Sequence, residues 1–282
     1  MAFSVASLRK RPTVFRALGR QSLPDRIEVG GQSYALIEEF KHDSWAATGL
    51  YENDQHGKVI SKFNRKQPVF GVPMSWLGRR LAYRENWFLE RLDEVDGIPK
   101  SLGPVSVDGK RQWNAIARSF VDGRPFTRRD REGYAFYDEL WRLVHALHER
   151  SIAYVDLHKR ENIIIDHSGS PHLVDFQVAF ALTKSWPGNG WLARRIFQVL
   201  ADMDCYHVRK HYAVCHSDDF SDEEREAYIA RPGFVRFHRR FAEPLRQFRR
   251  RLLTLLRIRD KSGLPSSEID AEAAFRVNRK ED

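Results

Sequence analysis

One stretch of the chain, from Tyr154 to Phe180, constrains the fold and the chemistry more than any other. Its sequence, YVDLHKRENIIIDHSGSPHLVDFQVAF, holds two short apolar runs joined by the polar turn DHSGS. Two such runs with a turn between them predict a β-hairpin. Asp156 and Asn162 precede and open the first strand, and Asp175 closes the second. The hairpin can therefore bring two carboxylates and one amide together.

This combination of side chains suits phosphoryl transfer. Mg²⁺ prefers carboxylate and amide oxygens, with phosphate and water completing its shell. A separate carboxylate must orient the hydroxyl that accepts the phosphoryl group. The alternative is a hairpin whose acids are only solvated, and we expect that outcome in about one such arrangement in ten.

The rest of the chain predicts strands first and helices later. Short apolar runs separated by polar turns between Tyr34 and Phe63 predict an antiparallel meander. Apolar residues at helical spacing predict a helix over 76–92, and two further strand-like runs follow it. A long helix is predicted from Thr127 to Arg150, and helix is also predicted over 200–214.

The order of these features resembles the catalytic core of the protein-kinase superfamily. The catalytic loop of that family carries an Asp and a following Asn, and another Mg²⁺ ligand begins a D-F-G motif. The resemblance covers about residues 34–180. It implies that Asp156 is the catalytic base and that Asn162 and Asp175 bind Mg²⁺.

Two residues upstream extend the resemblance. The sequence Val59-Ile60-Ser61-Lys62 is similar to the V-A-I-K of the family's third strand, which implies that Lys62 binds the α- and β-phosphates of ATP. Glu85, in the helix that follows, would hold this lysine, with Glu90 as the alternative. Taken alone, each would be read as a solvated surface residue, so both assignments depend on the hairpin.

The resemblance implies a two-lobed α+β fold of the protein-kinase type. We expect a basic N-terminal arm at 1–30, a five-stranded antiparallel N-lobe with one helix at 31–120, and a mainly helical C-lobe with the catalytic hairpin at 121–230. A hinge is expected near 120–125. Residues 231–282 would form a basic amphipathic helix and a tail.

Two departures from the family pattern concern loops. Five residues, Leu157 to Glu161, separate Asp156 from Asn162, where the family has four. We keep Asn162 because an apolar run follows it directly. The segment 41–48, KHDSWAAT, contains no glycine where a Gly-rich phosphate loop is expected. Weaker binding of ATP, or none, is therefore an open alternative.

Other departures concern the motifs themselves. Gln177 replaces the D-F-G glycine, and Tyr154-Val155 replaces the His-Arg that precedes the catalytic Asp. No A-P-E motif follows Asp175. These features point away from typical protein kinases and resemble the bacterial lipopolysaccharide core kinases, which include the Kdo and heptose kinases. A non-protein acceptor is therefore favoured.

Charge and composition bear on partners and location. The net charge of +9 is concentrated at 231–261, which holds eleven Lys and Arg against two acids on a continuous apolar stripe. Docking on its own domain is the first expectation for such a helix, and contact with an anionic membrane is the alternative. Nucleic acid is unlikely as a partner because the aromatic residues lie on the stripe.

The chain has two cysteines and no long uncharged apolar stretch, so we expect a cytoplasmic protein, with peripheral contact at the inner membrane face as an extension. Four residues could suggest a zinc site but are expected to serve helix packing, because ligands along one helix rarely converge: Cys205, His207, His211 and Cys215.

The function expected from the sequence is an ATP- and Mg²⁺-dependent kinase that phosphorylates a hydroxyl acceptor, in first place a lipopolysaccharide-type sugar. A Ser/Thr protein kinase and a pseudokinase scaffold are the alternatives. The acceptor itself is not specified by the fold.

Overall fold

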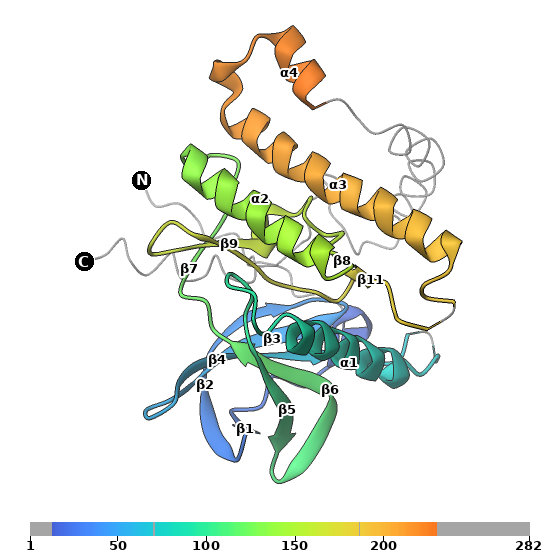
Figure 1. The fold of residues 1–282 in the computed structure, drawn as a ribbon. Coiled ribbons are helices and arrows are strands. Elements are labelled where there is room, and N and C mark those ends of the chain that lie inside the picture. Colours follow the sequence, from blue (N-terminus) through green and yellow to red (C-terminus); the bar gives the residue numbers. More distant parts are fainter. Residues whose placement is uncertain (1–12, 70, 186, 230–282) are drawn as a thin grey trace, which may run out of the picture.

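The computed structural model describes residues 13–69, 71–185 and 187–229, and it joins a sheet-rich N-terminal part to a mainly helical part (Figure 1). The mixed α and β content expected from the sequence is confirmed. The predicted helix at 231–261 lies outside the described residues. Within them, no helix is both long enough and apolar enough to span a membrane.

The N-terminal part is a closed antiparallel barrel with the strand order β1-β2-β3-β4-β6-β5. Apolar side chains from all of these strands fill its interior. The strands are β1 Arg26–Val29, β2 Gln32–His42, β3 Ala46–Asn53, β4 Gly57–Asn64, β5 Ser101–Val107 and β6 Lys110–Ser119.

The first strand corrects the expectation of five strands and of an N-terminal arm that extends to residue 30. β1 pairs with β2 on one side and with β5 on the other, which closes the barrel. Its burial alternates, with Ile27 and Val29 buried and Arg26 and Glu28 exposed. The sequence RIEV alternates over only four residues, the shortest length at which alternation indicates a strand, so pattern alone does not separate it from a basic arm.

Helix α1 (Ser75–Arg91) lies against β4 and β6 and follows the range predicted for it. Gly78 allows the close approach of this helix to the end of β4. A Cβ atom at this position would clash with the backbone carbonyl oxygen of Arg65. The glycine is therefore required by packing and not by its own backbone conformation.

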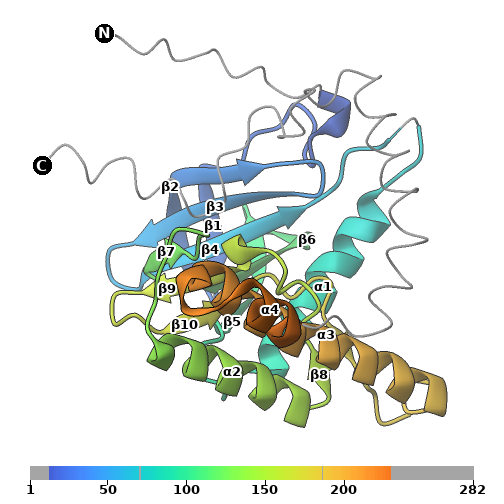
Figure 2. The same cartoon turned by 90° about the horizontal axis from the view of Figure 1, so that it is seen from above.

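The helical part is built around the predicted hairpin. β9 pairs with β10 as expected, and β7 adds a third strand to this small sheet. Helices α2 and α3 run side by side over it (Figures 1 and 2). The remaining elements are β7 Gly123–Pro125, α2 Tyr134–Glu149, β8 Ile152–Ala153, β9 Ile163–Asp166, β10 Pro171–Leu173, β11 Phe180–Ala181, α3 Trp191–Cys215 and α4 Asp222–Tyr228, with single 3-10 turns at Thr13–Phe15, Arg160–Asn162 and Ser217–Asp219.

Helix α2 begins later than the sequence predicts, at Tyr134 instead of Thr127. The carboxylate of Asp130 accepts hydrogen bonds from the Thr127 amide at 2.6 Å and from its hydroxyl at 2.7 Å. Arg124 binds the other oxygen of the same carboxylate. These local bonds compete with the helical hydrogen bonds and hold the segment as a turn.

We predict that Gly78→Ala destabilises the protein although alanine is the better helix former. Alanine is favoured over glycine in a helix by about 1 kcal/mol, but an overpacked contact costs about 1–3 kcal/mol. Because the clashing atom belongs to the backbone and cannot move aside as a flexible side chain can, the cost lies at the upper end of this range, and urea unfolding should show a net loss of about 2 kcal/mol. Arg80→Ala, at an exposed position two residues further along the same helix, is the control, since arginine and alanine have similar helix propensity and nothing is overpacked there. Equal free energies of unfolding for Gly78→Ala and the wild type would contradict the packing account.

Candidate active site

Lys62 lies at the centre of the candidate site. Lys62 lies on β4 opposite Thr48 of β3. Because side chains alternate along a strand, it points to the same face of the sheet as Ile60, two residues earlier. Its Nζ lies 2.8 Å from Asp175 Oδ1 and 3.2 Å from Glu85 Oε2. Three segments that are far apart in the sequence therefore meet at one ammonium group.

The charges of this cluster stabilise one another. Burial by itself lowers the pKa of Lys62, but the negative charges of Asp175 and Glu85 outweigh it and raise the pKa above its usual value. Burial raises the pKa of Glu85, and the positive charge of Lys62 opposes that effect. The pKa of Asp175 is lowered, because Lys62 outweighs the effect of burial. Lys62 is therefore held as a cation.

Helix α1 presents Glu85, and not Glu90, to the lysine. The carboxylate of Glu90 accepts a hydrogen bond from Asn86 Nδ2 at 2.7 Å instead. Arg84 holds the same helix in place, since its Nε donates to the carbonyl of Gln177 at 3.0 Å and its Nη2 donates to that of Ala179. The helix is thus tied to the segment that follows Asp175.

Asp175 has a left-handed backbone with φ of +65°. Only a few per cent of residues other than glycine adopt this conformation, and they are kept there by their surroundings. Phe176 is buried and packs edge-on against Tyr154 with ring centres 5.0 Å apart. Gln177, at the position of the expected glycine, donates from Nε2 to Asn64 Oδ1 at 2.5 Å. The glutamine therefore links this segment to β4.

Asp156 and Asn162 meet in the loop that precedes β9. Asn162 Nδ2 donates to Asp156 Oδ2 at 3.1 Å, so the longer loop still brings the two side chains together. Lys159 Nζ lies 2.7 Å from the same oxygen, and His158 Nδ1 lies 3.3 Å from Oδ1. Lys159 also contributes to the low pKa of Asp175. The amide of Val174, the residue before Asp175, donates to the backbone carbonyl of Asn162 at 3.0 Å, so the segments that carry the two groups lie next to each other.

Asp204 of α3 supports this loop and was not among the predicted residues. It is fully buried, and its carboxylate accepts hydrogen bonds from the backbone amides of Tyr154 at 2.7 Å and Val155 at 2.9 Å. Val155 has φ of +73°, which is a strained conformation for a β-branched residue. Asp204 therefore holds the strained backbone immediately before Asp156. An acid among the apolar residues of a predicted helix was the signal for it.

The turn between β2 and β3 occupies the place where the phosphate loop was expected. Asp43 Oδ1 accepts hydrogen bonds from the amides of Trp45 at 2.6 Å and Ala46 at 2.8 Å. The carbonyl of Asp43 accepts from the amide of Ala17 at 2.7 Å. The buried Arg65 donates from Nη1 to the carbonyl of Ser44 at 2.6 Å. The turn is thus held by the side chain of Asp43, by the N-terminal segment and by Arg65, which directly follows β4.

The donor atoms at the site fit Mg²⁺. Asn162 turns its amide nitrogen toward Asp156, which leaves its side-chain oxygen available to a metal ion, and Asp175 could supply a carboxylate. Mg²⁺ commonly uses one or two carboxylates together with substrate phosphates. Within residues 13–69, 71–185 and 187–229, no group of three or more His, Cys, Asp or Glu side chains is arranged to hold a metal ion.

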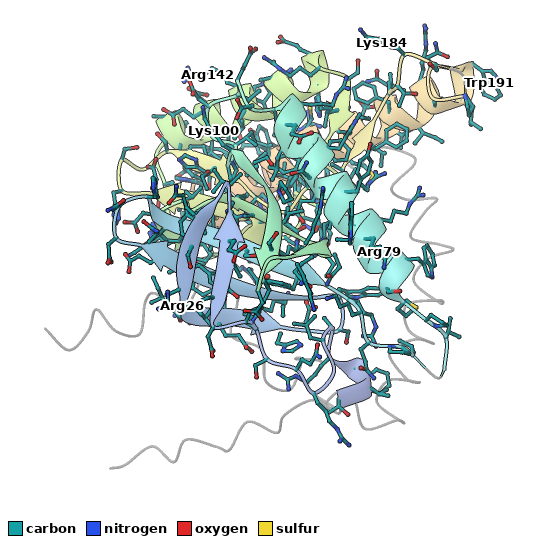
Figure 3. The ribbon with its side chains drawn as sticks, turned by 90° about the horizontal axis from the view of Figure 1, so that it is seen from below. Arg26, Arg79, Lys100, Arg142, Lys184 and Trp191 are labelled. Carbon is teal, nitrogen blue, oxygen red and sulfur yellow. The ribbon has the colours of Figure 1, made fainter. Side chains whose placement is uncertain are left out.

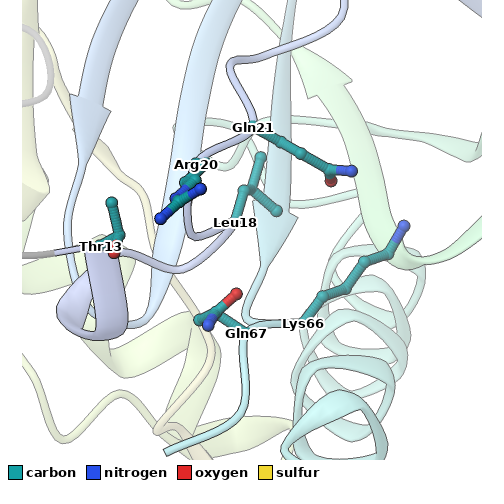
Figure 4. Close-up of a pocket in the computed structure, with 6 residues that line it drawn as sticks. All are labelled: Thr13, Leu18, Arg20, Gln21, Lys66 and Gln67. Atoms are coloured by element: carbon teal, nitrogen blue, oxygen red, sulfur yellow. The ribbon is translucent and has the colours of Figure 1, made fainter.

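Two of the four residues considered for zinc contact backbone carbonyl groups. His211 is buried and its Nε2 lies 2.7 Å from the carbonyl of Leu157, while Cys215 Sγ lies 4.0 Å from the carbonyl of Thr127. His211 therefore contacts the loop that carries Asp156. A separate pocket of about 430 Å³ beside the N-terminal segment includes none of the site residues (Figure 4).

Comparison with known proteins gives a distant likeness. No family model and no curated protein matches the chain. Two similar solved structures are both of the Rio2 kinase from Chaetomium thermophilum. One, an ADP/Mg²⁺-phosphoaspartate complex, is 16% identical with a TM-score of 0.46 and covers 73% of this chain and 62% of that chain. The other is also 16% identical with a TM-score of 0.46 and covers 76% and 64%.

This chain thus spans less than two thirds of the length of either kinase chain. At such identity and TM-score the likeness does not indicate what the chain does. Neither structure bears on the resemblance to the lipopolysaccharide core kinases, and the function has to be argued from the side chains that meet at Lys62 and Asp156.

We predict that His148 makes stability depend on pH. Its Nε2 lies 3.3 Å from Asp204 Oδ2. Burial lowers the pKa of His148, but hydrogen bonds to Asp204 and Cys205 and the charge of Asp204 raise it from 6.5 to about 9. Because the folded pKa is the higher one, the stabilisation is complete below the unfolded value and is lost as the pH rises through the folded value.

The contribution of His148 to the free energy of unfolding, measured with urea, should therefore fall as the pH rises from 6.5 to about 9. The fall should be less steep than about 1.4 kcal/mol per pH unit, which is the limit for one proton. The difference in unfolding free energy between wild type and His148→Gln isolates it, since other titrating groups cancel. A difference that does not change with pH would rule out the charged pair with Asp204.

Proposed function

We propose that this protein is an ATP-dependent phosphotransferase with a two-lobed protein-kinase-like fold, which phosphorylates a hydroxyl group of a non-protein acceptor. One observation carries the proposal. The side chains expected for this chemistry come from four parts of the chain and form two contacting groups, Lys62 with Glu85 and Asp175, and Asp156 with Asn162. The nucleotide would bind between the barrel and the helical part.

Each of these residues has a role that its contacts support. Lys62 would bind the α- and β-phosphates of ATP, and Glu85 would keep its ammonium group in position. Asp175 and Asn162 would hold Mg²⁺, which neutralises phosphate charge when it is bound. Asp175 now binds Lys62 at 2.8 Å, so this contact has to lengthen when a phosphate and a metal ion enter.

Asp156 would orient the acceptor hydroxyl and accept its proton. Lys159, at 2.7 Å from Asp156, is close enough to bind an incoming phosphate as well. The proton would leave the hydroxyl as the oxygen attacks the γ-phosphorus, and ADP would carry away the electrons of the broken bond. Such a transfer depends on positioning and charge more than on covalent chemistry by the protein.

The segment after Asp175 supports a non-protein acceptor. After Asp175 the chain forms the two-residue strand β11 and a loop and then enters α3, and this segment contains no A-P-E motif. The residue directly before Asp156 is Val155 and not an arginine that could bind a phosphate in that segment. A lipopolysaccharide-type sugar is the acceptor that the sequence resemblance favours, and a Ser/Thr protein substrate is the competing one. A cytoplasmic location is part of the same proposal.

A second candidate, a pseudokinase scaffold, is favoured by the turn between β2 and β3. The amides of Trp45 and Ala46 are bonded to Asp43 and do not point to a bound phosphate in this arrangement. In kinases a flexible glycine-rich loop covers the phosphates. This chain would have to bind ATP through Lys62 and the metal ion without such help.

We predict that Mg·ATP raises the melting temperature and that Asp175→Asn and Lys62→Ala abolish this shift. At a ligand concentration of about 100 times Kd, binding stabilises a protein by about 2.7 kcal/mol, which corresponds to several degrees. Lys66→Ala, a few residues along the same chain segment, is the matched control. Circular dichroism must show that the variants are folded.

The acceptor is tested by product formation. With membrane sugars as acceptors, Asp156→Asn should lower kcat by about 10²- to 10⁴-fold while the nucleotide-induced shift persists. Nucleotide binding without any transfer would favour the scaffold. No thermal shift in the folded wild type would reject the enzyme proposal altogether.

A further inference from the structure

The N-terminal end of α3 exposes large apolar side chains to solvent. Trp191 is 80% exposed, Leu192 56% and Ile196 41%. Side chains of this size are usually covered, and exposed groups of them mark interaction sites. This end of α3 projects beyond α2, as Figure 1 shows. It therefore presents an apolar cluster that the described part of the chain does not cover.

The same region is positively charged. Residues 181–201 contain Lys184, Arg194 and Arg195 but no Asp or Glu. All three cations are exposed or partly exposed. Figure 3 shows Lys184 and Trp191 together at the projecting end of α3. Cations thus accompany the apolar cluster along this segment, and no acid in the segment offsets their charge.

The N-terminal end of α1 has the same composition. Trp76 is 60% exposed and Tyr83 71%, with Arg79 and Arg80 exposed between them. Residues 55–84 contain no Asp or Glu. Both helix ends lie toward the same side of the molecule, the right-hand edge in Figures 1 and 2. A flat surface that approached from this side would meet both ends.

We propose that this face, formed by the N-terminal ends of α1 and α3, docks on an anionic phospholipid bilayer. Trp and Tyr rings favour the level of the lipid head groups, and Arg side chains are attracted to anionic lipids. The transfer of Leu192 and Ile196 from water to the acyl region is favourable. Aromatic, aliphatic and cationic side chains thus each have a partner in such a membrane.

Other occupants fit less well. A second copy of the chain would place the same cations opposite one another, which opposes association. Single-stranded nucleic acid would use the Trp rings and the Arg side chains, but it offers nothing to Leu192 and Ile196. An anionic bilayer offers favourable contacts to the aromatic, the aliphatic and the cationic side chains of this face together.

The face has a fixed relation to the candidate active site. Trp191 precedes Asp204 by thirteen residues on α3, which corresponds to about 20 Å along the helix. Asp204 holds the loop of Asp156. If the proposed function holds, docking therefore places the catalytic loop within about 20 Å of the docked end of α3, a distance that a lipid-linked sugar extending from the head groups could span.

Vesicle co-sedimentation of the full chain without nucleotide tests the docking independently of any kinase activity. Vesicles of phosphatidylglycerol with phosphatidylethanolamine are compared with vesicles of phosphatidylcholine alone. We expect binding to the anionic vesicles, weakened by salt. The double variant Arg194→Glu/Arg195→Glu should lower the partition coefficient by at least about tenfold, since each cation contributes about a factor of five.

Trp191→Ser/Leu192→Ser should also weaken binding. The matched control is Arg111→Glu/Trp113→Ser, which changes the same residue types on the β5–β6 hairpin of the barrel, where Trp113 is 59% exposed. It should leave binding unchanged.

Several results would overturn the proposal. Wild-type protein that ignores anionic vesicles, or α3 variants that bind as well as the control, would do so. So would size-exclusion chromatography that shows a wild-type dimer dissociated by the α3 variants, or a single-stranded oligonucleotide that displaces the protein from the vesicles and binds more tightly than they do.

Discussion

The ion cluster around Lys62 is the interaction on which the rest of the site depends. A buried ammonium group is costly unless opposite charges surround it, and here Asp175 and Glu85 lie 2.8 and 3.2 Å away. The cluster joins β4, α1 and the segment after β10, so none of these elements can move without exposing or unpairing a charge. The contacts of Arg84 and Gln177 reinforce the same arrangement.

One strained backbone position lies in the cluster and another directly precedes Asp156, and the two share a support. Val155 and Asp175 both have positive φ, a conformation that costs about 1–3 kcal/mol when the residue is not glycine. Asp204 offsets the first strain by binding two backbone amides. The buried side chain of Tyr154 connects the two positions, since its hydroxyl donates to the carbonyl of Val174 and its ring packs on Phe176. Strain is therefore held where the chemistry would occur.

The sequence predicted the features that depend on local pattern. The hairpin and α1 follow from spacing and periodicity. The five candidate site residues follow instead from the resemblance to the protein kinases, and the structure places Lys62, Glu85 and Asp175 in one ion cluster and joins Asp156 to Asn162 by a hydrogen bond. It did not predict β1, because four residues carry little pattern and their pairing with β2 and β5 is a long-range event. Asp204 was missed for a similar reason, since its partners lie about fifty residues earlier in the chain. The late start of α2 reflects the competing bonds of Asp130.

The turn between β2 and β3 changes how a phosphate would be held. A glycine-rich loop supplies backbone amides that close over the nucleotide, but here Asp43 binds those amides and Arg65 and the N-terminal segment fix the turn. The barrel can then offer the phosphates a cation, Lys62, and little else. The compensating charge lies in the helical part, where Lys159 is close enough to lower the pKa of Asp175. A site of this kind would bind nucleotide mainly through charge and metal, so its affinity should depend more on ionic strength than on closure of a loop.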